Sequence, residues 1–237
     1  MIRDNHVHDH KGGAKPLPGT DGIHVYRSAG PGAVYGNLVE RVGDDPISLG
    51  SFDAAHPTTD FLVAKNECRD TAGGIKLYGN AHRGEVRGNA VAHTRNGGVI
   101  LWDDRDAAKS FDIYDIEICA NILLDCGGLG ASAGVYLCSP EGTGSSLMRG
   151  IDIHGNHIKD GHYGVTLYAR ASNKSFKDIR IADNEISGMD KNAVFLFDFA
   201  GHVDVVGNTI AYSGQPAIRI SSNRVSGSVR CSDNVLR

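Results

Sequence analysis

The chain has 237 residues, a size that suits one large domain or two small ones. Its net charge of −4 at pH 7 argues against a nucleic-acid or anionic-membrane partner, because both require a basic protein surface. No apolar run approaches the roughly 18 residues of a membrane span, so none is predicted. The five cysteines show neither a zinc-site nor a disulfide-rich spacing, and most are predicted to be free thiols.

An asparagine with apolar residues at fixed offsets recurs along the chain. Asn156 shows the pattern: Ile151 and Ile153 lie before it, and Ile158 follows it. Copies spaced about 23 to 35 residues apart, some with one small or polar residue, surround Asn5, Asn37, Asn66, Asn89, Asn121, Asn156, Asn184, Asn208 and Asn234. We expect each asparagine at a bend between two short strands, where it tolerates a left-handed backbone and can hydrogen-bond to the next asparagine.

A second pattern lies between successive asparagines: Gly, Ala or Pro, then two apolar residues separated by one other residue. In chain order it occupies residues 22–25, 46–49, 74–77, 98–101, 134–137, 164–167, 193–196 and 217–220. Alternation with a period of two predicts short strands with one buried face. Three such strands in constant order per repeat can wind as a coil, in which each strand pairs in parallel with its equivalent one coil further on.

This residue pattern resembles that of the pectin-lyase-like β-helix superfamily over nearly the whole chain. We therefore predict an all-β, single-stranded right-handed parallel β-helix of about eight to nine coils, with three strands per coil. A β-sandwich with coincidental spacing does not account for nine matches at one offset. Residues 1–237 are predicted to form a single domain. Because its first and last coils start and stop abruptly, we expect a longer chain or partner chains to cover the ends.

The side chains that alternate with the buried positions of the second pattern should point outward in parallel columns. One column reads Tyr26, Gly50, Tyr78, Trp102, Cys138, Tyr168, Phe197 and Ser221, which is unusually aromatic for a solvent-facing row. Exposed rings in a line suit stacking on sugars, and cover by a loop or a partner subunit is the alternative. The long connections 8–20, 51–58, 103–112, 126–133 and 138–149 flank this strand, as the walls of a groove would.

An acidic cluster is predicted near the N-terminal end of this face. Asp21 precedes the first strand of the second pattern, and Asp44 and Asp45 precede the next, so their backbones should lie about 5 Å apart. Clustered carboxyl groups push each other's pKa values apart, as the acid and base of glycoside hydrolysis require. Asp in such Gly-flanked segments is also ordinary turn chemistry, and this alternative stays open.

Two segments of the cluster resemble motifs of the polygalacturonase family of pectin-degrading glycoside hydrolases. Gly19-Thr20-Asp21-Gly22 and Asp44-Asp45 match these motifs in residue type and spacing. The resemblance implies that Asp21, Asp44 and Asp45 form the acid and base pair of an inverting hydrolysis. The next family motifs, Gly-His-Gly and Arg-Ile-Lys, have no counterpart in register, where Gly73-Gly74 and Ile100-Leu101-Trp102 stand instead.

Substrate binding is therefore assigned to other residues of the same face. These are His24, Tyr26, Lys76, Tyr78, Trp102, Arg105, Tyr136 and Tyr168. Asp103 and Asp104, next to Arg105, are interpreted as part of a solvated loop in preference to a second carboxylate site.

Three functions remain open. The first is a glycoside hydrolase that acts on an acidic polysaccharide through the three aspartates, without a metal or other cofactor. The second is a polysaccharide lyase of the same fold, which needs a base such as Lys76 or His24 and often calcium. The third is a non-catalytic glycan-binding or structural segment, such as part of a phage tailspike. The expected partner is a polysaccharide, assembly as a trimer or end to end is considered, and the expected location is extracellular or virion-associated.

Overall fold

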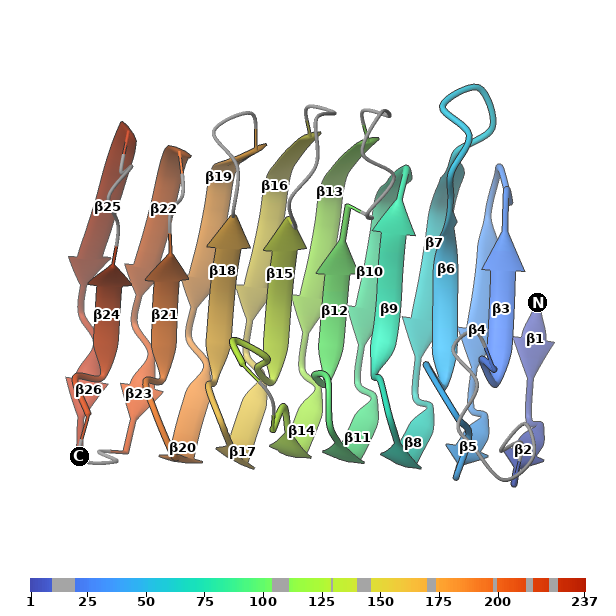
Figure 1. Cartoon of the computed structure of the whole chain (residues 1–237), viewed down its shortest axis with the longest axis horizontal. Helices are drawn as coiled ribbons and strands as arrows, with labels where there is room; N and C mark the ends of the chain where they lie inside the picture. The colour runs from blue at the N-terminus through green and yellow to red at the C-terminus, as the bar shows by residue number, and fades with distance from the viewer. Residues whose placement is uncertain are drawn as a thin grey trace.

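The computed structural model describes residues 1–9, 20–103, 111–128, 130–139, 146–169, 174–197, 200–211, 215–221 and 226–237. These residues form strands, turns and bends and contain no α-helix. Among them is accordingly no helix long and apolar enough to cross a membrane. The strands stack coil upon coil along one axis, with the two termini at opposite ends of the stack (Figure 1).

The described part of the chain forms three parallel sheets. Sheet A contains, in stacking order, β1 (Ile2–Arg3), β4 (Gly32–Tyr35), β7 (Thr58–Ala64), β10 (Ala81–Arg87), β13 (Phe111–Cys119), β16 (Ser146–His154), β19 (Lys174–Ala182), β22 (Ala200–Val206) and β25 (Ser226–Ser232). Sheet B contains β2 (His6–His8), β5 (Leu38–Glu40), β8 (Glu67–Thr71), β11 (Ala90–Thr94), β14 (Ile122–Cys126), β17 (His157–Gly161), β20 (Glu185–Met189), β23 (Thr209–Ile210) and β26 (Val235–Leu236). Sheet C contains β3 (Ile23–Tyr26), β6 (Ile47–Ser51), β9 (Ile75–Gly79), β12 (Val99–Trp102), β15 (Val135–Ser139), β18 (Val165–Ala169), β21 (Val194–Phe197) and β24 (Ile218–Ser221).

Each coil contributes one strand to each sheet. Neighbouring strands in every sheet differ by three in chain order, and the three sheets contain nine, nine and eight strands. The prediction of a parallel β-helix with three strands per coil and eight to nine coils is therefore confirmed. The second pattern of the sequence corresponds to sheet C, and the asparagine-centred pattern spans the bend between sheets A and B.

The nine asparagines form a continuous hydrogen-bonded ladder through the molecule. Asn89 illustrates the rung: its side-chain Nδ2 and its backbone N both donate to Asn121 Oδ1, each at 3.0 Å. The same pair of bonds joins Asn121 to Asn156, and equivalent side-chain bonds run from Asn5 to Asn234. The ladder satisfies polar groups that would otherwise be buried without partners.

The left-handed backbone at this bend belongs to a different residue from the one we expected. Positive φ angles occur at the residue before the asparagine, for example Lys65 (54°), Ala120 (53°) and Asp183 (54°). The asparagines themselves are absent from the positive-φ residues of the described chain. The reason is that each asparagine uses its side chain and its backbone N–H to hold the next coil, and the preceding residue turns the chain.

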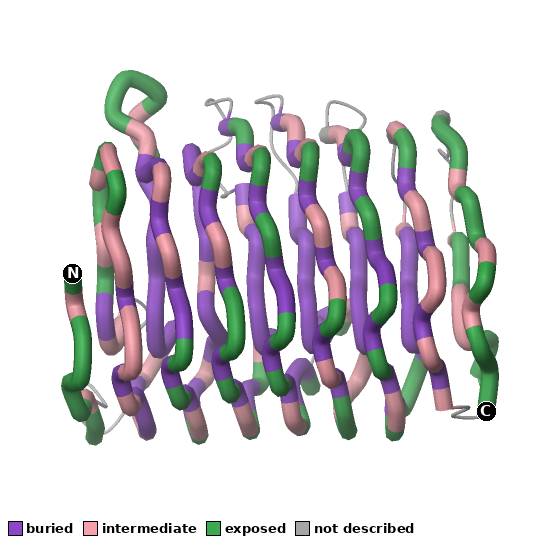
Figure 2. The backbone as a smooth tube through the Cα atoms, turned by 180° about the vertical axis from the view of Figure 1, so that it is seen from behind, coloured by how far each residue is buried: buried purple, intermediate pink, exposed green. Residues whose placement is uncertain are grey.

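A single apolar core runs along the inside of the stack. Its ladders include Ile47, Ile75 and Val99 in sheet C, all fully buried, and it continues from Ile23 to Ile210. Seen from behind, the strands of the middle coils alternate between buried and exposed stretches, whereas the last coil is mostly exposed (Figure 2). Successive side chains of a strand point to opposite faces of the sheet, so every second residue points away from the core. Equivalent outward residues of successive coils line up in columns, and the candidate site lies on these columns.

Candidate active site

The outward columns of sheet C follow the predicted register. His24 pairs with Ser48 and Ser48 with Lys76, whereas Tyr26 pairs with Gly50 and Gly50 with Tyr78. The next strand places Trp102 beside Tyr78. Parallel pairing thus brings residues more than fifty positions apart in the sequence into one patch on β3, β6, β9 and β12.

Three carboxyl groups converge where β3 and β6 begin. The nearest side-chain oxygens of Asp21, Asp44 and Asp45 all lie within 4.8 Å of one another. The backbone N of Asp45 donates to Asp21 Oδ1 at 3.3 Å, and the backbone N of Gly22 donates to the Asp45 carbonyl oxygen at 3.0 Å. The coil-to-coil pairing itself therefore holds the acids together, as the sequence predicted.

Asp45 is the most enclosed member of this cluster. Its side chain is 4% exposed, and its Oδ2 lies 3.1 Å from Lys76 Nζ. Gly73 packs directly over it, since a Cβ at this position would overlap Asp45 Oδ1. Burial raises the pKa of Asp45 to about 7, Asp44 and Asp21 add to the shift, and Lys76 opposes it. This carboxyl group therefore keeps its proton up to near-neutral pH.

Lys76 and His24 connect the acids to the aromatic column. Burial would lower the pKa of Lys76, but Asp45, Asp44 and Asp21 outweigh this effect and raise it. The Lys76 ammonium lies 5.8 Å from the centre of the Trp102 ring. His24 Nδ1 is 3.4 Å from Asp21 Oδ2, and His24 Nε2 is 2.5 Å from the Tyr78 hydroxyl. The imidazole thus links the more accessible acid to a tyrosine two coils away.

The aromatic column is less open than the sequence suggested. Tyr26 is exposed (44%), but Tyr78 is buried, and Trp102 and Tyr168 are partly buried. Tyr136, which pairs with Ile100 in the neighbouring outward column, is also buried. Phe52, which sequence reasoning missed, lies 4.7 Å from Tyr78 and 6.4 Å from Tyr26, ring centre to ring centre. Covered rings stack on one another, as Tyr168 does on Phe197 at 5.0 Å. The interpretation as a fully solvent-facing row is therefore wrong, and the open part lies at the Tyr26 end.

The interpretation of Asp103 as part of a solvated loop is also wrong. Asp103 is 1% exposed and its Oδ2 accepts hydrogen bonds from the hydroxyl groups of Ser139 and Ser146. Both serines come from the next coil, so this acid joins coils together and does not face solvent. Arg105 and Asp104 lie outside the described residues.

The three acids also have the donor chemistry of a site for a hard cation. Carboxylate oxygens are the ligands that calcium prefers in proteins. Asp45, however, already has the Lys76 ammonium as its positive partner at 3.1 Å. A bound divalent cation would have to displace Lys76, so the residues fit acid and base chemistry better than cation binding.

The family model described as a right handed beta helix region matches residues 1–112. No curated protein matches the sequence. Among solved structures, the catalytic unit of a thermostable GH87 α-1,3-glucanase from Streptomyces thermodiastaticus strain HF3-3 superposes with a TM-score of 0.68 and 16% identity. This superposition covers 98% of this chain and 43% of the glucanase chain.

A tailspike protein mutant of E. coli bacteriophage HK620, in complex with a pentasaccharide, superposes with a TM-score of 0.63 and 11% identity. This superposition covers 99% of this chain and 41% of the tailspike chain. The chain thus spans about two fifths of the length of the two structures. Identities this low show the fold alone. Together with the register of the three sheets and the family model, they show that the chain has the right-handed parallel β-helix fold.

Proposed function

We propose that this β-helix is a glycoside hydrolase that acts on an acidic polysaccharide through Asp21, Asp44 and Asp45. The observation that supports the proposal is the convergence of three carboxyl groups, one of which keeps its proton near neutral pH. Glycoside hydrolysis needs a carboxylic acid to protonate the leaving oxygen and a second carboxyl group as base or nucleophile. The two solved structures named above, a glucanase and a tailspike with a bound pentasaccharide, put glycan-directed proteins on the same fold.

The geometry suggests a separate role in catalysis for each of the three aspartates. Asp45 is enclosed by Gly73 and Lys76 and stores the proton, whereas Asp21 and Asp44 are partly exposed. With oxygens within 4.8 Å of each other, the carboxyl groups lie close enough for the proton of Asp45 to pass to an outer aspartate. In this proposal the proton leaves the cluster through an outer aspartate, and the other outer aspartate acts on the sugar or on the attacking water.

The side chains around the acids favour an acidic sugar. Lys76 is 29% exposed and stays protonated, and the exposed Tyr26 ring offers an apolar face two strands away on the same sheet. Arg27 lies over that ring, 4.9 Å from its centre. A uronate or another anionic sugar could place its ring on Tyr26 and its carboxylate near these cations. The remaining predicted binding residues, Trp102, Tyr136 and Tyr168, continue along the same face.

A lyase of the same fold is the second candidate. Its base must take a proton from the carbon next to a uronate carboxylate. Lys76 is a poor base because its pKa is raised by the three acids. His24 is half exposed and remains the candidate, with one ring nitrogen against Asp21 and the other against the Tyr78 hydroxyl.

The test compares the wild-type chain with Asp21→Asn, Asp44→Asn and Asp45→Asn on a panel of neutral and acidic polysaccharides. Asp190→Asn is the matched control, since Asp190 is an exposed acid far along the stack, with a side chain 78% exposed. We expect new reducing ends without ultraviolet-absorbing products. Each of the three variants should lose at least about 100-fold in turnover, and the control should be unchanged.

Other outcomes separate the alternatives. Products that absorb in the ultraviolet, from a new double bond, would show a lyase, and His24→Gln would then be the inactivating change. Binding of a glycan without any product would show a non-catalytic glycan-binding segment. Full turnover by Asp45→Asn, with product formed, would overturn the assignment of the acids. Assembly as a trimer or end to end stays a prediction, to be measured by light scattering.

A further inference from the structure

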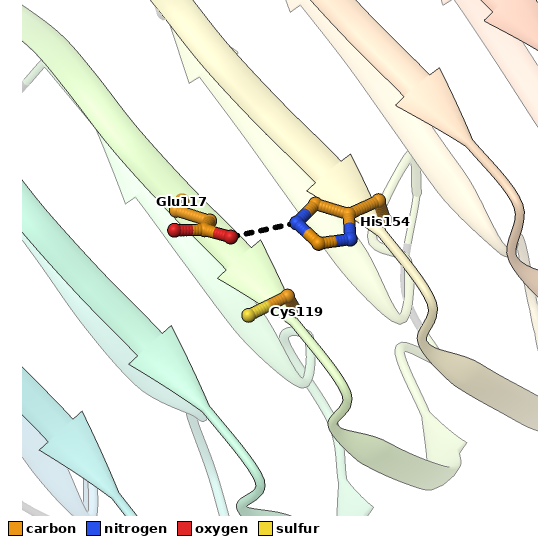
Figure 3. Close-up of side chains that lie close together, drawn as sticks. All are labelled: Glu117, Cys119 and His154. Carbon is orange, nitrogen blue, oxygen red and sulfur yellow. Dashed lines mark hydrogen bonds and ion pairs between the residues drawn. The ribbon is translucent and has the colours of Figure 1, made fainter.

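We propose that the outer face of sheet A carries a binding site for a borderline divalent metal ion such as Zn²⁺, formed by Glu117, Cys119 and His154. One ligand atom of each residue, a carboxylate oxygen, the thiol sulfur and an imidazole nitrogen, lies within 4.8 Å of the others. Figure 3 shows the three side chains converging from two neighbouring strands. The site lies on a different sheet from the acidic cluster and is independent of the proposed function.

The strands hold the three ligands in a fixed arrangement. Glu117 and Cys119 are two residues apart on β13, so their side chains lie on the same face of the sheet. His154 is the register partner of Cys119 on β16. Its Nε2 lies 2.7 Å from Glu117 Oε1 (Figure 3). Ligands on paired strands move little relative to each other, which favours a preorganised metal site.

The distances need only small side-chain rotations to accept a metal. Tetrahedral Zn²⁺ with bonds of roughly 2.0 to 2.3 Å separates its ligand atoms by roughly 3.2 to 3.8 Å. The Glu117 and His154 atoms, which lie 2.7 Å apart, would move apart by somewhat more than half an ångström. Glu117 is 47% and His154 33% exposed, whereas Cys119 is 8% exposed. Solvent can therefore reach the carboxylate and the imidazole, and the thiol closes the base of the site.

The surroundings attract a cation. Glu117 pairs in register with Glu85 on one side and with Asp152 on the other. Arg87 pairs with Glu85 and Arg180 with Asp152, and a positive ion beside Glu117 would relieve the repulsion that remains among the three carboxylates. The same three acids line a hollow on the outer face of sheet A, next to Gly84 and Gly150. Of the three ligands, this hollow reaches Glu117.

The ligand set selects the kind of metal. Calcium and magnesium prefer oxygen ligands, whereas a thiolate and an imidazole favour Zn²⁺ and its neighbours such as Co²⁺. Three protein ligands leave a fourth position of Zn²⁺ for water or another ligand. The site therefore differs in metal preference from the all-carboxylate cluster of Asp21, Asp44 and Asp45.

The experiment loads the chelator-treated full chain with Co²⁺ or Zn²⁺ and measures absorption spectra and calorimetric binding. We expect one ion per chain, a thiolate-to-cobalt charge-transfer band, and no comparable binding of Mg²⁺. Cys119→Ser should remove the band and weaken Zn²⁺ binding at least about 100-fold, whereas Cys231→Ser, which changes the exposed cysteine of β25, should alter neither. Glu117→Gln, at an exposed position, tests the site without disturbing the core, and should weaken Zn²⁺ binding at least about tenfold.

Two results would overturn the proposal. One is the absence of a thiolate band when the folded wild-type chain is given excess Co²⁺. The other is a band that persists in folded Cys119→Ser and disappears in Cys231→Ser, which would place the bound metal at the other thiol. Circular dichroism of each variant checks that it is folded.

Discussion

Asp45 belongs to the candidate site, and its surroundings shift the pKa of its carboxyl group. Its side chain is buried, two further carboxyl groups lie within 4.8 Å, and one ammonium group compensates for part of the charge. Removing a carboxylate from water disfavours its charged form more than Lys76 favours it. The result is an acid whose pKa matches the range in which general acid catalysis is most effective.

This protonation has a consequence for stability. In the unfolded chain Asp45 has a pKa near 3.8, and in the folded chain a pKa near 7. Between these values the unfolded chain loses a proton that the folded chain keeps, so the free energy of unfolding falls as pH rises from about 4 to about 7. Below and above this window Asp45 adds no further pH dependence. The loss amounts to about 4 kcal/mol at most.

Urea unfolding of the wild type and Asp45→Asn across this pH range measures the effect. The asparagine has a similar shape and no charge, so its stability relative to the wild type should increase with pH and level off above about pH 7. The control Asp190→Asn should follow the wild-type curve. A constant difference between wild type and Asp45→Asn would show that the folded-state pKa of Asp45 is ordinary.

At the scale of the strand and the bend, the asparagine ladder accounts for much of the register. The Asn121 side chain is fully buried, and its Oδ1 accepts two bonds from Asn89 while its Nδ2 donates to Val86 O and to Asn156 Oδ1. A buried polar group that loses its partner costs about 1 to 3 kcal/mol. Each rung therefore secures two coils, one on either side.

Asn121→Ala should lower the free energy of unfolding by about 3 kcal/mol or more, because both Asn89 donors and the Val86 carbonyl lose a partner. Asn5→Ala is the matched control. Asn5 is exposed at the first rung and, among the described residues, its Oδ1 accepts no hydrogen bond, so its replacement should cost less than about 1 kcal/mol. Equal losses at the two positions in urea unfolding would contradict the role given to the ladder.

The sequence was sufficient for these elements because their spacing repeats. The offsets around Asn156 and its equivalents predicted the strands, the coil and the columns of sheet C, including the neighbourhood of Asp21 and Asp45. The residues that cover the aromatic side chains on the outer face of sheet C could not be predicted from this spacing. Tyr78 and Tyr136 are buried by neighbours such as Phe52 and Ala131 that lie outside the repeating positions. The spacing of residues in the sequence also does not show how far an outward side chain is covered by its neighbours. The burial of Asp45 and Asp103 is therefore visible only in the packing of the folded chain.

The second cluster shows the same limit. Glu117, Cys119 and His154 lie on strands that the asparagine offsets predicted, and their register could have been laid out as it was for sheet C. The signal available in the sequence was a cysteine two residues before Asn121 and a histidine two residues before Asn156.

The whole molecule is held together by one core. A continuous cluster of buried side chains extends from Ile23 to Ile210 without a break between coils. Each coil contacts only its neighbours, so cooperativity depends on the strength of the coil-to-coil interfaces. The continuous core and the ladder favour a single cooperative unit, and we propose that residues 1–237 behave as one domain.

Unfolding followed by two signals tests this proposal. The chain contains one tryptophan, Trp102, and it lies in β12 in the middle of the stack. Tryptophan fluorescence reports the middle coils, whereas far-ultraviolet circular dichroism reports all strands. We expect the two urea transitions to coincide. Two separated transitions would show that parts of the stack unfold independently.

The most direct test of the proposed chemistry is the dependence of kcat/KM on pH for the polysaccharide that the wild-type chain cleaves. If the cluster supplies the proton to the leaving oxygen, the rate should fall on the alkaline side with an apparent pKa near 7, the value of Asp45. The Asp190→Asn control should keep this limb. A rate that stays level or rises through pH 7 would contradict the account, because the group that holds the proton would then not be the group that donates it.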